Sequence, residues 1–143
     1  MHRSLNLLVS LLVVASVCGA EDALKPIEHS AFNEMVAGAG QASDIWVSHP
    51  VTVSLLFIDH QRGGGQVMAH QEEITLKSTP EAFEDAVVTI DRSGFLDDSV
   101  AADRYVITLG RRPGNEWIIE SAHYGRRCRE GRGHADYSND PCT

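Results

Sequence analysis

The C-terminal stretch CREGRGHADYSNDPC, residues 128–142, brings together several types of side chain that could do chemistry. Two cysteines bracket a short loop that is rich in glycine and arginine and also holds a histidine, acidic residues and a tyrosine. Such a set suits three structures: a metal site, an anion-binding or catalytic loop, or a disulfide that only closes the loop. The rest of the chain must decide among them.

A metal site in this stretch would use zinc-type ligands. The loop offers four of them: Cys128, His134, Asp136 and Cys142. Their spacing lacks the close ligand pairs that structural zinc sites show, so we favour a disulfide over a metal and expect no cofactor. A weak alternative metal set is His60, His70 and His134, since the first two flank a run of three glycines and could approach each other across a hairpin.

The start of the chain indicates the compartment. Residues 1–20 combine a basic start, an apolar run from Leu5 to Val17 and small residues before Glu21, which is typical of a secretory signal peptide cleaved after residue 20. The run is too short to span a bilayer, so we expect no transmembrane segment after cleavage. Cys18 raises a lipid anchor as an alternative, but a lipid-attachment box has a small residue where Val17 stands. We therefore predict a periplasmic or secreted protein.

Export changes the interpretation of the terminal cysteines. Once Cys18 leaves with the signal peptide, Cys128 and Cys142 are the only pair, in a compartment where disulfides persist. Closing the ring would stabilise the fold by about 3 kcal/mol in the chain-entropy estimate. Inside the ring, residues 131–134 could form a backbone nest for a carboxylate or phosphate, or the glycines only let the loop turn while the arginines pair with acids of the body. The candidates for contact with an anion or a partner are Arg126, Arg127, Arg129, Arg132, His134, Asp136 and Tyr137.

Charge is distributed unevenly along the chain. Without Arg3, eleven basic residues stand against twenty acidic ones, a net charge of 11 − 20 = −9, so nucleic acid is a poor partner. Residues 21–103 hold fifteen acids and four bases, whereas residues 104–143 hold seven arginines and five acids. The arginine-rich end is suited to an anionic partner, which we expect to be a protein or an envelope component.

Catalytic spacing is absent from the sequence. There is no G-x-S-x-G motif, and a disulfide leaves no free thiol. The neighbouring carboxylates Asp97 and Asp98 would point to opposite faces of a strand, which does not suit a shared proton. We therefore favour a non-catalytic exported binding or interaction module that uses the arginine-rich loop. The alternative is a metal-binding protein or small hydrolase with a site around His134 and Asp136.

Residues 21–143 have the length of a single small globular domain. An apolar stripe with helical spacing begins at Ile27 and continues to Val36, and we expect Gly38 and Gly40 to end this helix. Residues 45–59 alternate in a way that favours a strand, although a short buried helix over residues 51–58 remains an alternative.

Strand patterns dominate the remainder of the chain. We predict strands over residues 66–78 and 86–92, separated by a short helix over residues 79–86 whose signals are a capping hydroxyl and Pro80. A hairpin over residues 104–128 turns at Pro113-Gly114. The predicted class is α+β: an N-terminal helix packed on an antiparallel β-meander of four to five strands, with a C-terminal loop closed by a disulfide.

Several stretches together resemble an uncharacterised group of small exported bacterial proteins. They are LDDSV (96–100), RYVITL (104–109), EWIIESAHYGRRC (116–128) and GRGHADYSNDPC (131–142). Proteins of that group end in Cys, then Gly-Arg-Gly-His, an acid, an aromatic residue, Ser and Pro-Cys. The resemblance implies a bacterial, exported, disulfide-bearing protein and brings no activity with it. One departure is Arg126, which stands where the group has an aromatic residue.

Overall fold

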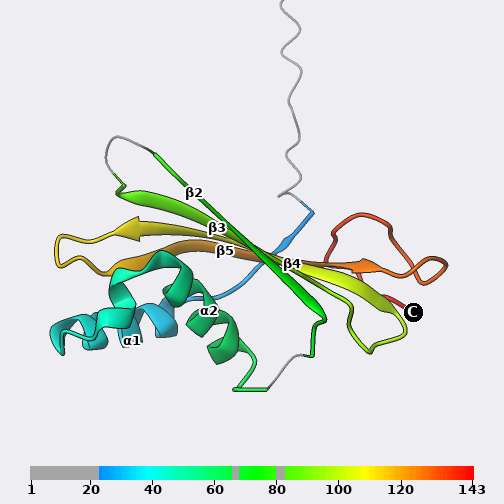
Figure 1. Cartoon of the computed structure of the whole chain (residues 1–143), viewed down its shortest axis with the longest axis horizontal. Coiled ribbons are helices and arrows are strands. Elements are labelled where there is room, and N and C mark those ends of the chain that lie inside the picture. The colour runs from blue at the N-terminus through cyan, green and yellow to red at the C-terminus, as the bar shows by residue number, and fades with distance from the viewer. Residues whose placement is uncertain (1–22, 66–67, 80–82) are drawn as a thin grey trace, which may run out of the picture.

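A computed structural model describes residues 23–65, 68–79 and 83–143, and the predicted signal peptide lies outside them (Figure 1). The elements in chain order are β1 (Lys25–Pro26), α1 (Ser30–Gln41), a 3₁₀ turn η1 (Ile45–Ser48), α2 (Pro50–Gln61), β2 (Gln71–Ser78), β3 (Asp85–Ser93), β4 (Val100–Arg111) and β5 (Trp117–Cys128). Two helices on an antiparallel sheet confirm the predicted α+β class.

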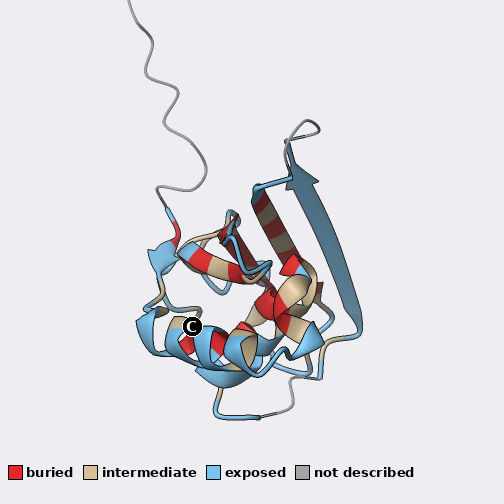
Figure 2. Cartoon of the chain, turned by 90° about the vertical axis from the view of Figure 1, so that its left-hand side faces the viewer, coloured by how far each residue is buried: buried red, intermediate tan, exposed pale blue. Residues whose placement is uncertain are grey.

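The sheet has five strands in the order β1-β5-β4-β3-β2, and every neighbouring pair is antiparallel. Strands β2 to β5 form the predicted meander, and the two-residue β1 adds an edge beside β5. The helices cover one face of the sheet (Figure 1). The predicted hairpin over residues 104–128 is confirmed, and its first strand begins earlier, at Val100. β2 lies beside β3 at the other edge and is exposed along its whole length (Figure 2).

The core lies between the two helices and the helix-facing side of the sheet. Its fully buried large side chains come from both layers: Phe32, Val36, Val53, Phe57, Val88, Ile90, Ile107, Leu109, Trp117 and Ile119. On α1, Phe32 and Val36 lie one turn apart and both are buried, while Met35 is half exposed. Burial of each such side chain contributes about 1.5–3 kcal/mol of transfer free energy, which holds the helices on the sheet.

The strand predicted over residues 45–59 is wrong, because these residues form η1 and α2, and the helical alternative is correct. Pro50 occupies the first turn of α2, where its missing N–H costs nothing. Val53 and Phe57 are buried one turn apart against the sheet. The spacing of apolar residues in this segment fitted both the strand period of two residues and the helix period of about 3.6, since residues four apart share a face in a strand as well as in a helix.

The expected end of the first helix at Gly38 and Gly40 is also wrong, because α1 continues to Gln41. Each glycine costs about 1 kcal/mol in a helix interior, and packing of Val36 and Phe32 offsets this. Gly40 has a local reason as well: a Cβ at this position would collide with the side chain of Glu116.

The helix predicted over residues 79–86 is wrong where the structure describes it. Ser78 ends β2 and pairs with Ala86, and β3 already begins at Asp85. Residues 80–82 lie outside the described residues. Pairing of β2 with β3 therefore overrides the local capping signal in this short connection.

A buried ion pair lies at one end of the core, where β3 ends and β4 begins. Arg92 donates to both carboxylate oxygens of Asp103, at 3.0 and 2.9 Å, and both side chains are almost fully buried. Arg62 adds a longer contact of 3.4 Å from the end of α2. The Arg92 guanidinium lies 5.0 Å from the centre of the Tyr105 ring. Burial raises the pKa of Asp103, and its hydrogen bonds with Arg92 oppose that effect.

We expect Arg92→Ala to lower the free energy of unfolding by about 3–5 kcal/mol, because it leaves the buried Asp103 carboxylate without its partner. Replacing Arg92 and Asp103 together by leucine should recover most of this loss. The exposed pair partner Arg132 is the control, and Arg132→Ala should cost about 1 kcal/mol or less. Urea unfolding with the disulfide intact measures the free energy of unfolding of all three variants. Equal losses for Arg92→Ala and Arg132→Ala would contradict the claim that the buried Arg92–Asp103 pair stabilises the fold more than the exposed pair does.

Candidate functional site

The predicted disulfide is confirmed. Cys128, the last residue of β5, is bonded to Cys142, with a Cα–Cα distance of 5.4 Å that is usual for such bonds. We call residues 128–142 the disulfide loop. It lies at the end of the sheet away from α1 (Figure 1).

The disulfide loop folds back along the edge of β5. Ser138 and Arg126 exchange two backbone hydrogen bonds, of 2.9 and 2.8 Å, so the loop extends the edge that β1 begins. The next side chain, Tyr137, packs on the face of the sheet opposite the helices. There the Arg104 guanidinium lies 4.2 Å from the centre of the Tyr137 ring. Arg104 is itself held by two hydrogen bonds to Asp91, at 2.6 and 2.9 Å. The predicted contact residue Tyr137 is therefore part of the docking of the loop.

Two glycines make this close approach possible. Gly125 on β5 is buried, and a side chain there would collide with Leu24 and crowd the backbone of Ser138. Gly133 has φ +137°, and a Cβ there would lie 2.9 Å from the sulfur of Cys128. The GRG motif is thus explained in part by the packing of the loop on its own disulfide.

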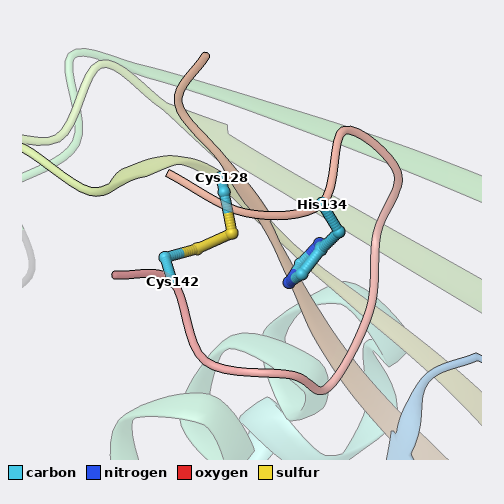
Figure 3. A group of neighbouring side chains, drawn as sticks. All are labelled: Cys128, His134 and Cys142. Atoms are coloured by element: carbon cyan, nitrogen blue, oxygen red, sulfur yellow. A yellow bond between two sulfur atoms is a disulfide. The ribbon is translucent and has the colours of Figure 1, made fainter. Parts of the chain in front are cut away.

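His134 is the centre of the loop (Figure 3). Its Nδ1 lies 2.7 Å from the carbonyl oxygen of Asp136, and its Nε2 lies 2.9 Å from that of Asp140. Since carbonyls only accept hydrogen bonds, both ring nitrogens must donate, which requires the protonated imidazolium. The carbonyls of Asp140 and Asp136 accordingly raise the pKa of His134. When protonated, His134 therefore links two carbonyls of the loop.

The structure brings together three of the four predicted zinc ligands. Ligand atoms of Cys128, His134 and Cys142 lie within 4.8 Å of one another, without Asp136 (Figure 3). The two sulfurs are bonded to each other, and both ring nitrogens of His134 lie within hydrogen-bond distance of carbonyl oxygens. No other group of three potential ligands comes as close among the described residues.

The alternative set of three histidines is not assembled. His60 packs on the ring of Phe32 in the helical layer, with 5.7 Å between the ring centres. His70 stands just before β2, where its backbone N–H donates to Ser93. Neither residue contributes with His134 to a group of potential ligands in the part of the chain that the structure describes.

The arginines of the loop have different surroundings. Arg129 donates to the carbonyl oxygens of Phe95 and Asp97, at 2.9 and 3.0 Å, and Arg132 forms an exposed ion pair with Asp98 at 3.0 Å. The interpretation that arginines pair with acids of the body thus holds for Arg132. Arg129 instead donates to carbonyls and forms no ion pair with a described residue, although its charge helps to lower the pKa of Asp97.

The two remaining arginines lie on opposite faces of β5. Arg126 points to the helix-facing side, above the ring of Tyr124, and its Nε is buried without an acceptor in the described residues. Arg127 is exposed, 5.9 Å from the centre of the Tyr137 ring, and forms no ion pair with any described residue. Of the four arginines predicted to contact an anion or a partner, Arg127 is therefore an exposed one at the end of β5 whose guanidinium has no ion-pair partner among the described residues.

Asp97 organises the turn that receives Arg129, a role that the sequence reasoning missed. Its Oδ1 accepts three hydrogen bonds, from the hydroxyl and backbone N–H of Ser99 and from the N–H of Val100. These bonds lower the pKa of Asp97 to about 2. The signal was the Asp-x-Ser spacing, which is typical of a turn closed by an aspartate side chain.

A hollow of about 670 Å³ opens beside the disulfide, lined among others by Arg127, Arg129, Glu130, Gly131, Gly133 and His134. The charged residues among them are Arg127, Arg129 and Glu130, and the pKa of His134 is raised by the carbonyls of Asp140 and Asp136. The backbone N–H groups of residues 130, 131, 133 and 134 have no acceptor among the described residues. The hollow is therefore lined by two arginines and one acidic residue, and several residues of its lining have backbone N–H groups without an acceptor among the described residues.

Comparisons with protein-family models, with curated proteins and with solved structures gave no match. Within the described residues, neither helix has the length and apolar character needed to cross a membrane.

The doubly bonded His134 predicts a pH-dependent contribution to stability. Because its pKa is raised in the folded state, this contribution is fully present below the unfolded pKa of about 6.5 and is lost as the pH rises through the folded pKa. His134→Ala should therefore lower the free energy of unfolding more at about pH 5.5 than at about pH 9, by urea unfolding. The matched control is His70→Ala, an exposed histidine outside the loop. A loss at His134 that is the same at both pH values would contradict the imidazolium assignment.

Proposed function

We propose that this protein is an exported, non-catalytic binding module that holds an anionic group of a protein or envelope component in the hollow of the disulfide loop. The observation that carries the proposal is the convergence of Arg127, Arg129 and the charged His134 on one hollow, with only Glu130 as an opposing charge. The proposal has an oxyanion bound there by the cationic side chains and by backbone amides that lack an acceptor among the described residues.

The backbone of the hollow is held in place before any ligand binds. The amides of Cys128, Arg129 and Arg132 donate to His134, Ser99 and Arg129 respectively, and the disulfide closes the ring. A site that is ordered in advance loses little conformational entropy on binding. This supports binding at the loop itself and favours a small rigid anionic group over an extended segment.

The chemical class of the ligand follows from the hydrogen-bond donors of the hollow. A guanidinium at Arg127 and neighbouring backbone amides suit planar carboxylates, phosphates and sulfates, which accept several hydrogen bonds at once. The surrounding body is acidic, so binding depends on a local excess of positive charge and should weaken with salt. The hollow is large enough for an acidic group that is attached to a larger molecule, such as a peptide terminus or a phosphorylated headgroup.

Export is a part of this proposal that rests on three supports. The sequence begins with a pattern typical of a signal peptide, the chain resembles exported bacterial proteins at its C-terminal end, and Cys128 and Cys142 form a disulfide. Disulfides persist in the periplasm and outside the cell. The anion would accordingly be one that is present in those compartments.

We expect Arg127→Gln to weaken binding of inorganic phosphate by about tenfold, because it removes one charge-assisted contact from the hollow. Arg127→Lys should recover part of the affinity, and Arg112→Gln in the β4–β5 turn is the matched control that should change nothing. Isothermal titration calorimetry at low salt, repeated with acetate and sulfate, measures these affinities and ranks the oxyanions. Phosphate binding that is equally lost with Arg112→Gln, or that is indifferent to Arg127→Gln, would contradict the proposed site.

A further inference from the structure

One edge of the sheet is covered by neighbouring backbone, and the other edge is open. The β5 edge is covered by β1 and then by Ser138 of the disulfide loop. The β2 edge has no strand beside it among the described residues, and all eight residues of β2 are exposed (Figure 2). A long, uncovered edge strand presents a row of unpaired backbone donors and acceptors to any strand that fits it.

The direction of the free backbone groups on β2 follows from the neighbouring strands. The Arg111 amide donates to the carbonyl of Glu84, so Glu84 faces β4. Alternation along β3 then directs its odd-numbered residues toward β2. Through the register of β2 with β3, residues 71, 73, 75 and 77 face β3, while residues 72, 74, 76 and 78 direct their N–H and C=O groups outward.

The side chains of β2 carry an apolar pair on one face. Ile74 and Leu76 lie opposite Ile90 and Val88, which are buried under the helices, yet they remain 38% and 41% exposed themselves. The helical layer thus ends before β2 and leaves a short apolar strip open at the edge. On the other face, Glu73 and Lys77 stand on either side of Thr75.

We propose that β2 is the interface at which two copies of this chain pair, antiparallel, about a two-fold axis through Thr75. In this register Ile74 lies opposite the partner's Leu76, and Glu73 lies opposite the partner's Lys77, each pairing occurring twice by symmetry. The outward backbone groups of residues 72, 74, 76 and 78 face one another in hydrogen-bonding pairs, and the two sheets become one continuous sheet of ten strands.

The sequence of β2 favours this register over its neighbour. An axis through Ile74 would still pair the outward backbone groups of the two strands. It would, however, place Glu72 opposite the partner's Leu76 and Glu73 opposite the partner's Thr75. The axis through Thr75 instead matches apolar with apolar and acid with base, the combinations that stabilise cross-strand pairs. Charge complementarity within one strand is therefore what identifies a second copy as the occupant. The proposal is independent of the anion-binding function.

A charge swap tests the interface. In sedimentation velocity over a concentration series, the purified protein should dimerise, and Glu73→Lys or Lys77→Glu alone should each weaken dimerisation by about tenfold because like charges then face each other twice. The double swap should restore the wild-type dissociation constant, and Glu34→Lys on α1 is the control with the same change of charge. A protein that stays monomeric, or singles whose losses add in the double swap, would overturn the proposal.

Cross-linking tests the axis. Directly opposed residues at a non-hydrogen-bonded position have Cα atoms about 4.5 Å apart, which suits a disulfide. Thr75→Cys should therefore give a covalent dimer under mild oxidation, and Ile74→Cys should give far less. A cross-link that forms at Ile74→Cys and not at Thr75→Cys would overturn the assigned register.

Discussion

The bidentate pair between Arg92 and Asp103 is the interaction on which the end of the sheet that carries the disulfide loop depends. It lies where the apolar core ends, and it binds β3 to β4 directly before their connecting loop. That loop supplies the carbonyls of Phe95 and Asp97 to which Arg129 is tied. Satisfying one buried carboxylate thus fixes the position of the turn against which the disulfide loop is docked.

The residues that attach the disulfide loop to the sheet differ from those that we propose to bind a ligand. Ser138, Tyr137 and Arg129 attach it to the body through backbone pairing, stacking on Arg104 and carbonyl contacts. His134 braces it from within. Arg127 and the amides near Gly131 are left over, and they surround the hollow.

Features set by local chemistry could be predicted from the sequence, and features set by tertiary pairing could not. The Cys128–Cys142 bond and the β4–β5 hairpin follow from cysteine count, alternation and a Pro-Gly turn. The helix α2 was ambiguous because Val53 and Phe57 share a face in either period. The capping signal near Pro80 predicted a helix, but pairing of β2 with β3 determines the structure on either side of it. No spacing in the sequence could show that both ring nitrogens of His134 lie beside carbonyl oxygens.

The central claim is that the disulfide loop is an oxyanion site assembled in advance, and an amide-detected NMR titration with inorganic phosphate tests it most directly. We expect saturable shifts of the Gly131 and Gly133 amides and of the Arg127 side chain, with the shifts confined to the disulfide loop and the end of β5 beside it. Shifts that are absent there, or that centre on Arg111 and Arg112 at the opposite end of the hairpin, would contradict it.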